Sequence, residues 1–235
     1  MFLKLILKLL ATIFGGKPTQ APPPAKLDTA ARIIRALDRR GAVVHRKPGE
    51  VNIVYVEGAD FDDDEHGNAS YKANGNKPNL WNDVRVCVLF EDGKPVIHSW
   101  WQATTEPGHR YTQNPIAAGG AARIKLGQQK VWQVGLHRGY EALAQTGAAV
   151  VVTRDANKDY KRDGDKTTMG FYGINQHHGH DAPEHDVGPH SAGCLVGKDK
   201  DGHWEFMALV KSDPRYKANS RYVFDTTVIE AAELD

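Results

Sequence analysis

The sequence predicts a mainly β domain with a few helices, in the α+β class. Short runs rich in β-branched and aromatic residues recur along the chain and are bounded by Gly and Pro, as strands are. Only two stretches carry a clear helical pattern, one near each end of the domain. The chain has 235 residues, of which 40% are hydrophobic and 25% are charged, so it can bury an ordinary globular core.

The first helix is the one with the most complete set of signals. Asp28 and Thr29 are suited to cap its N-terminus, and Gly41 is suited to end it after two arginines. Its apolar residues follow the i, i+3, i+4, i+7 spacing of one helix face, at Ala30, Ile33, Ile34 and Leu37.

Six runs then have the composition of strands, and one later run has that of a helix. The expected strands span residues 51–56, 84–90, 95–101, 121–125, 130–136 and 148–153. The second helix is expected around residues 204–210, where the apolar residues again follow a helical period. Strands therefore dominate, with one helix at each end of the domain.

Two acidic segments, residues 60–65 and 155–165, are expected to be loops between strands. The second places carboxylates and an amide at alternate positions, as a calcium loop does. It lacks the expected glycine and is followed by Lys166 instead of Glu. We expect a solvated turn, and calcium binding stays open.

The N-terminal part has a different composition from the domain at residues 27–235. Residues 1–16 are strongly apolar, interrupted by Lys4 and Lys8, and have the character of an anchor or a signal-like segment. Residues 17–26 are Pro-rich and predict a semi-rigid linker. We expect membrane association through residues 1–14, or export.

Charge and cysteine content narrow the possible partners. The net charge of +1 gives no electrostatic support for nucleic acid as a main ligand. The chain has two cysteines, and Cys87 lies within an apolar strand-like run. We expect Cys87 to be a buried, inert thiol and not a disulfide partner of Cys194.

Cys194 lies in a turn of small residues, and two histidines precede it in the chain. A cysteine near an imidazole is the usual arrangement for nucleophilic catalysis, because an ordinary thiol is mostly protonated at neutral pH and needs a base. We expect Cys194 to be the nucleophile and either His177 or His178 to be the base that activates it. If the segment before Gly179 is extended, the two histidines point to opposite faces, so only one can serve.

Other residues are candidates for supporting roles. The small size of Gly193 would let the backbone approach a substrate carbonyl, with N–H groups near Cys194 facing the oxyanion. We expect Ser191 to shape the turn by hydrogen bonding to the backbone. Arg154 and Arg123 are candidates to bind a substrate carboxylate, and His190 is a candidate to bind substrate or orient the base.

The segment Ile174–Asn175–Gln176–His177–His178–Gly179, followed by Ser191–Ala192–Gly193–Cys194, resembles the His and Ser-x-Gly-Cys motif of the L,D-transpeptidase (YkuD-like) family. Residues 82–216 are similar to an uncharacterised phage and bacterial branch of that family. The Ile-Asn-x-His spacing of that branch favours His177 as the base, whereas the His-Gly adjacency favours His178; we choose His177.

The resemblance implies a fold, an activity and a location. The fold would be an L,D-transpeptidase-like β-sandwich or mixed sheet that presents the cysteine in its turn. The activity would be attack on an amide bond of a peptidoglycan stem peptide, with a thioester on Cys194 and transfer of the acyl group to an amine or to water. No cofactor is implied, and the location would be the cell envelope or periplasm.

Two alternatives from other classes remain. The histidines around the motif, with nearby carboxylates and Cys194, suit zinc and would make a His-rich zinc-dependent hydrolase. These residues are His177, His178, His180, His185, His190, Asp181 and Asp186. The other alternative is a non-catalytic peptidoglycan-binding module, favoured by Val196, which stands where many L,D-transpeptidases have Arg or Asn.

Overall fold

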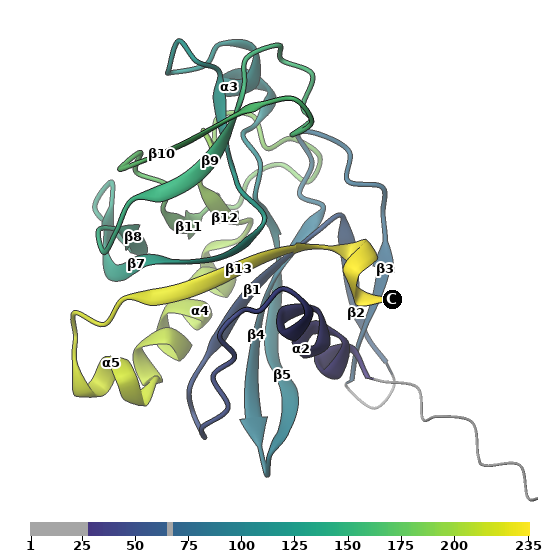
Figure 1. The fold of residues 1–235 in the computed structure, drawn as a ribbon, viewed down its shortest axis with the longest axis vertical. Helices are drawn as coiled ribbons and strands as arrows, with labels where there is room; N and C mark the ends of the chain where they lie inside the picture. Colours follow the sequence, from purple (N-terminus) through teal and green to yellow (C-terminus); the bar gives the residue numbers. More distant parts are fainter. Residues whose placement is uncertain (1–27, 65–67) are drawn as a thin grey trace, which may run out of the picture.

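The computed structural model describes residues 28–64 and 68–235, and its main feature is a closed barrel of eight strands (Figure 1). Around the barrel the strands follow the order β1-β13-β7-β8-β11-β12-β5-β4. A three-stranded sheet, β10-β9-β6, and a two-stranded sheet, β2-β3, complete the strands. The predicted N-terminal segment (residues 1–16) and linker (residues 17–26) lie outside the described residues.

The elements have the following bounds. The barrel strands are β1 (Asn52–Glu57), β4 (Asp83–Glu91), β5 (Lys94–Thr104), β7 (Gly127–His137), β8 (Tyr140–Gln145), β11 (Gln176–His178), β12 (Leu195–Gly197) and β13 (Phe224–Glu230). The other strands are β2 (Ala59–Asp63), β3 (Ala69–Ala73), β6 (Ala121–Ile124), β9 (Val150–Asp155) and β10 (Lys166–Gly170). The helices are α2 (Thr29–Arg39), α3 (His109–Gln113), α4 (Lys200–Ser212), α5 (Pro214–Ala218) and the 3₁₀ turn η1 (Ala231–Leu234).

The expectation of a mainly β domain with a few helices is confirmed. The main sheet is mixed, because β1 pairs with β13 and β11 pairs with β12 in parallel while the other barrel pairs are antiparallel. It closes on itself into a barrel, which leaves no unpaired strand edge in this sheet.

Most of the predicted elements are present at the expected positions. Helix α2 begins directly after Asp28, whose side chain accepts a hydrogen bond from the Ala31 N–H at 2.7 Å and so caps the helix. The six predicted strands correspond to β1, β4, β5, β6, β7 and β9, and the second helix corresponds to α4.

Two expectations were wrong. The acidic segment at residues 60–65 is not simply a loop, because Asp60, Asp62 and Asp63 belong to β2, which pairs with β3. Nor does the second helix, α4, end the domain: α5, the strand β13 and the 3₁₀ turn η1 follow it, and β13 inserts beside β1 in the barrel. Its β-branched residues are buried on both faces, and this parallel pairing is a long-range contact that local sequence does not reveal.

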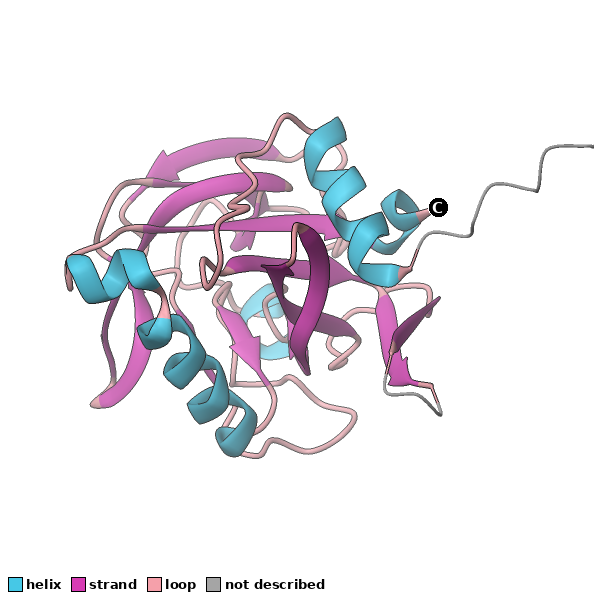
Figure 2. Cartoon of the chain, turned by 90° about the horizontal axis from the view of Figure 1, so that it is seen from below, coloured by secondary structure: helices cyan, strands magenta, loops and turns pink. Residues whose placement is uncertain are grey.

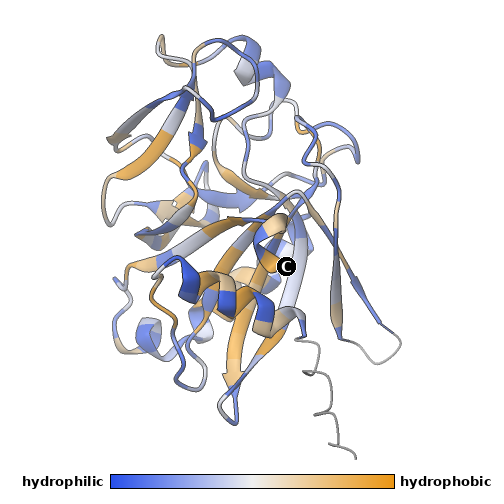
Figure 3. Ribbon diagram, turned by 45° about the vertical axis from the view of Figure 1, so that its right-hand side comes forward, coloured by the Kyte–Doolittle hydropathy of each residue, from blue (hydrophilic) through white to orange (hydrophobic). Residues whose placement is uncertain are grey.

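The core has two layers, separated by the wall of the barrel. Along β1, Ile53 and Tyr55 face one apolar cluster inside the barrel, while Val54 and Val56 face a second cluster that α2 covers. Figure 2 shows the strands between α4 and α5 on one side and α2 with η1 on the other. In Figure 3 the hydrophobic colour concentrates on the barrel strands. Both faces of β1 are thus buried, which explains its continuous apolar sequence.

The small sheet β10-β9-β6 lies beside the short barrel strands β11 and β12 (Figure 1). The turn before β12 contacts this sheet, since the Gly193 backbone packs against the carbonyl of Ala122 on β6. The two sheets therefore meet around Cys194. Within the part of the chain that the structure describes, no helix is long and apolar enough to cross a membrane.

Candidate active site

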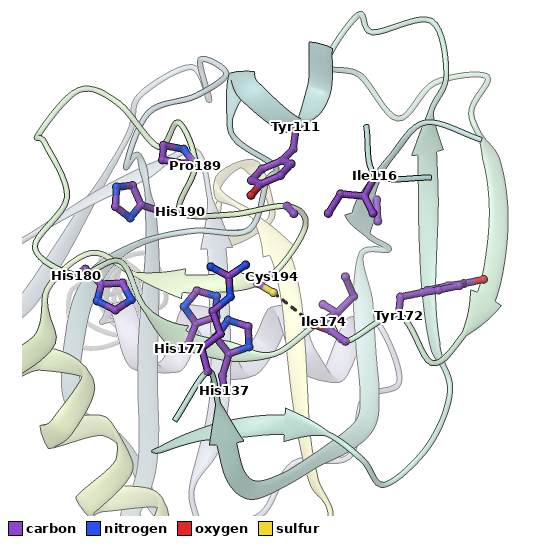
Figure 4. Close-up of a pocket in the computed structure, with 14 residues that line it drawn as sticks. Tyr111, Ile116, His137, Tyr172, Ile174, His177, His180, Pro189, His190 and Cys194 are labelled. Carbon is purple, nitrogen blue, oxygen red and sulfur yellow. Dashed lines mark hydrogen bonds between the residues drawn. The ribbon is translucent and has the colours of Figure 1, made fainter. Parts of the chain in front are cut away.

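A pocket of about 250 Å³ opens where the small sheet meets the barrel, and it contains Cys194 (Figure 4). Its lining residues are Tyr111, Ile116, Ala122, His137, Arg138, Tyr172, Gly173, Ile174, His177, His180, Pro189, His190, Ala192 and Cys194. The lining includes one arginine and four histidines but no carboxylate. In Figure 4, Cys194 lies near the imidazoles of His177 and His137, with Ile116 and Tyr172 on the other side of the pocket.

The parallel pairing of β11 with β12 brings the two motifs together. Gln176 is opposite Leu195 and His177 is opposite Val196, so the residue just before β12, Cys194, lies beside the start of β11. Parallel strands need a crossover connection, and here residues 179–194 provide it. This explains how residues so far apart in sequence line one pocket.

The imidazole of His177 has a defined tautomer. Its Nδ1 lies 2.8 Å from the backbone carbonyl of His178, so Nδ1 carries the proton and donates a hydrogen bond to that oxygen. Its Nε2 has no hydrogen-bond partner among the described residues and is not fully enclosed by protein atoms. Burial, together with the smaller effect of the neighbouring His137, lowers the pKa of His177 to about 3. His177 is therefore neutral, with Nε2 available as an acceptor.

The thiol of Cys194 is held by the segment just before β11. Its Sγ donates a hydrogen bond to the Gly173 carbonyl at 3.4 Å. Burial raises the pKa of Cys194, although a hydrogen bond from the Asn175 N–H opposes this shift. The resting groups are therefore a neutral thiol and a neutral imidazole, because both are buried.

The turn before Cys194 depends on Ser191 and Gly193. The Ser191 hydroxyl donates to the Cys194 carbonyl at 2.9 Å and accepts the Gly193 N–H at 3.2 Å, which confirms its predicted role in shaping the turn. Gly193 has φ +122°, and a Cβ there would lie 2.4 Å from the Ala122 carbonyl oxygen. Glycine is thus required at this position for packing against β6.

The expected oxyanion site in this turn is only partly available. The Gly193 N–H is bonded to Ser191, and the Leu195 N–H donates to the Asn175 carbonyl at 3.0 Å. Two of the N–H groups that flank Cys194 are therefore already engaged within the protein.

His178 points away from the Cys194 pocket. Its ring makes edge contacts with those of Tyr140, His180 and Trp204, at centroid distances of 5.0, 4.2 and 5.4 Å. It is buried and does not line the pocket. Burial lowers its pKa to about 4. Of the two candidate bases, the structure places only His177 beside Cys194.

Arg123 is not available to a substrate, which corrects its predicted role. Its guanidinium is buried and bonds to the carboxylates of Glu57 and Glu106 and to the Tyr160 carbonyl. The carboxylates of Glu57, Asp83 and Glu106 and the guanidiniums of Arg123 and Arg162 form an internal ionic cluster. The guanidinium of Arg123 is therefore engaged by buried carboxyl groups, and Arg123 belongs to the framework behind the pocket.

Arg154 and His190 lie at the margins of the pocket. The Arg154 guanidinium stacks on the ring of Tyr172, 4.3 Å from its centroid, and donates to the Thr168 hydroxyl. It does not itself line the pocket, whereas Tyr172 does. His190 does line the pocket, and its ring packs against that of Trp81.

Sequence reasoning missed two residues of the pocket, His137 and Arg138, at the tip of the β7-β8 hairpin. His137 stacks on His177 with 4.2 Å between ring centroids and 10° between ring planes. Arg138 and Gly139 have φ +49° and +87°, which suits a tight hairpin turn. An Arg-Gly pair just after the expected strand at residues 130–136 could have indicated the turn, but nothing local indicated that it faces Cys194.

The structure also bears on the expectations of an inert thiol at Cys87 and of a zinc site among the histidines. Cys87 is fully buried and is not in a disulfide, and burial raises its pKa to about 12, as expected for an inert thiol. Among the described residues no group of three or more His, Cys, Asp or Glu is arranged to hold a metal ion. His185, one of the histidines considered for zinc, is exposed and does not line the pocket.

No family model matches the chain, and neither a curated protein nor a solved structure does. The likeness to L,D-transpeptidases therefore rests on the motif residues themselves.

Proposed function

We propose that this protein is a peptidoglycan-directed cysteine enzyme with an L,D-transpeptidase-like fold, which acts on amide bonds of stem peptides through a thioester on Cys194. The observation that carries the proposal is the shared pocket of Cys194 and His177, in which the His178 carbonyl fixes the His177 tautomer. A nucleophile, a base and a group that orients the base are the parts that such catalysis needs.

The neutral resting pair favours proton transfer during attack over a preformed thiolate. His177 Nε2 accepts the thiol proton as Sγ forms a bond to the amide carbonyl carbon. The C–N bond then breaks, and the departing amine takes the proton from the imidazolium, which leaves a thioester. An incoming amine or water attacks the thioester and passes a proton through His177 back to Cys194. The thiol is regenerated, and no external redox partner is needed.

The proposed location is the cell envelope, with membrane association through residues 1–14. The substrate would then be peptidoglycan stem peptides outside the membrane. The Pro-rich residues 17–26 would separate the domain from the membrane surface.

Incubation of the full chain with purified muropeptides, followed by mass spectrometry of the products, tests the activity. New cross-links would indicate transpeptidation, and shortened stems would indicate hydrolysis. A Cys194→Ala protein is the matched control and should give neither. If the wild-type protein leaves every muropeptide unchanged, the proposed activity is wrong.

A non-catalytic peptidoglycan-binding module is the second candidate. The observation that favours it is the protonated resting thiol, since burial raises the pKa of Cys194 and lowers that of His177. Val196, in the position where many L,D-transpeptidases have a polar residue, is fully buried beside Trp81 and cannot contact a substrate. This candidate predicts that the Cys194→Ala protein retains muropeptide binding and that the wild type shows no turnover.

A further inference from the structure

The tip of the β7-β8 hairpin presents two hydrogen-bond donors to the pocket that contains Cys194. His137 and Arg138 are consecutive residues, and both line this pocket. Neither belongs to the motif that indicated the catalytic residues. Because both residues line the same pocket as Cys194, they are placed to contact a substrate there.

A chain of hydrogen bonds fixes the tautomer of His137. The Gln145 N–H can only donate, and it donates to the side-chain oxygen of Asn175 at 2.8 Å. The Asn175 amide nitrogen therefore faces His137 Nδ1, 2.8 Å away, and donates to it. Because Nδ1 accepts, the proton of neutral His137 is on Nε2.

The Nε2–H of His137 is unused within the protein. It has no acceptor among the described residues and is not fully enclosed. The pKa of His137 is lowered, first by burial and then by the charge of Arg138, so the ring acts as a neutral donor. The stacked His177 ring holds it in place from one side.

Arg138 is also uncommitted. It is exposed at the pocket, and the described residues offer it neither a hydrogen bond nor an ion pair. Its charge reaches the sulfur, since it opposes the burial effect on the pKa of Cys194. Since the lining contains no carboxylate, nothing within the pocket neutralises this guanidinium.

We infer that Arg138 and His137 form an anion subsite beside Cys194, which binds a carboxylate carried by the substrate next to the attacked carbonyl. A guanidinium and a fixed N–H donor on one turn match the acceptor oxygens of a carboxylate. The inference deepens the proposed function, on which it rests for the identity of the substrate. It also explains how the pocket can recognise an acidic peptide although Val196 and Arg123 are buried.

Alkylation of Cys194 with two reagents of similar size, one anionic and one neutral, tests the subsite without any peptidoglycan. Iodoacetate carries a carboxylate, whereas iodoacetamide is neutral. The rates would be measured at one alkaline pH and low salt, by intact-protein mass spectrometry, on the full chain with Cys87→Ala. The same protein unfolded in urea gives the reference ratio of the two rates.

We expect the folded protein to favour iodoacetate more than the unfolded protein does. Arg138→Gln should slow iodoacetate about fivefold or more, the order expected for loss of one nearby opposite charge, while iodoacetamide changes less than about twofold. His137→Gln should lower the same ratio to a smaller extent. Arg110→Gln, which removes an arginine from α3 outside the pocket lining, should leave the ratio unchanged.

The outcomes separate this subsite from the proposed function. If the folded protein shows no preference for iodoacetate, or if Arg138→Gln leaves this preference intact, the subsite is overturned, whether or not muropeptides are turned over. A preference that depends on Arg138, in a protein that leaves muropeptides unchanged, supports the subsite and refutes the proposed substrate. The unchanged iodoacetamide rate shows that each variant still presents Cys194 in a folded pocket.

Discussion

His177 and Cys194 are both uncharged at rest, and this decides how the site should respond to pH. A thiolate-imidazolium pair would react with alkylating reagents at neutral or acid pH. Burial instead raises the pKa of the thiol and lowers that of the imidazole, so each change disfavours such a pair. His177 would then matter during turnover more than in the resting enzyme.

The first prediction concerns His177→Gln. Because the thiol is protonated at neutral pH, the rate of Cys194 alkylation by iodoacetamide should rise only in the alkaline range, and His177→Gln should leave this profile nearly unchanged. Turnover of muropeptides should fall by roughly 10²–10⁴-fold, since the variant cannot accept the proton. His178→Gln should retain most of the turnover, with its melting temperature measured because His178 is buried.

An acidic arm in the alkylation profile that disappears in His177→Gln would contradict the neutral pair. A loss of turnover in His178→Gln, with His177→Gln still active, would mean that the wrong histidine has been assigned as base.

The second prediction compares the two cysteines. Cys194→Ala should abolish turnover and leave the melting temperature almost unchanged, because it removes one sulfur at the edge of a pocket. Cys87→Ala should leave turnover intact, since that thiol lies in the core inside the barrel. A thiol-directed probe, mapped by peptide mass spectrometry on the folded protein, should label Cys194. Labelling of Cys87 alone would refute the assignment.

At the scale of elements, the pocket depends on the close approach of the turn before β12 to β6. The third prediction is that Gly193→Ala destabilises the protein by roughly 1–3 kcal/mol more than Gly127→Ala. Gly193 and Gly127 have similar φ values, +122° and +105°, but a Cβ at Gly127 would meet only the end of the Arg40 side chain, at 3.9 Å, whereas one at Gly193 would collide with the Ala122 carbonyl. Urea unfolding of both variants measures the difference. Equal losses would show that only backbone strain, and not the contact between the sheets, requires the glycine.

The elements that could be predicted from sequence are those with a local signal. Helix α2 has its cap, its apolar face and its terminal glycine, and β1, β4 and β5 are rich in β-branched and aromatic residues. Strands β11 and β12 have three residues each, which is too short for any periodicity to be visible. They exist because of parallel pairing between distant segments, and so only the motif indicated their importance.

The residues of the candidate site also divide into those with a local signal in the sequence and those without one. Cys194, His177 and Ser191 could be identified because residue type and spacing carry their chemistry. The hairpin tip with His137 and Arg138 could not, because its place in the pocket depends on closure of the barrel through β7, β8 and β11. Arg123 was assigned to substrate because sequence gives its charge but not the buried carboxylates around it.

At the scale of the whole molecule, the internal ionic cluster connects the barrel to the small sheet. Glu57 ends β1, Asp83 begins β4 and Arg123 lies on β6, next to the pocket residue Ala122. The Arg162 guanidinium adds a bond of 2.6 Å to Glu57. These contacts hold the two sheets that enclose Cys194 in one arrangement.

The cluster has more acidic groups than basic ones. It contains three carboxyl groups, those of Glu57, Asp83 and Glu106, but two guanidiniums. The single proton of the Thr105 hydroxyl cannot satisfy both carboxyl groups that it contacts, at 2.6 and 2.9 Å. Burial and the neighbouring negative charges raise the pKa of Asp83 to about 6. For Glu106, burial raises the pKa to about 8, although Arg123 opposes the shift.

The last prediction is that stability falls as pH rises from about 5 to 9, and that Glu106→Gln reduces this fall. The pKa of Glu106 is raised above its ordinary value of 4.5, so the folded state binds the proton more tightly than the unfolded state does. Stability from this proton is complete below the ordinary value and is lost as pH rises toward 8, by roughly 2–4 kcal/mol. Gln is a neutral isostere of the protonated acid and has no such loss. Urea unfolding at pH 5 and pH 9 measures it, with the exposed Glu91→Gln as control. If the wild type and Glu106→Gln lose the same stability over this range, Glu106 is ionised throughout, and another carboxyl group of the cluster must hold the proton that offsets the surplus negative charge.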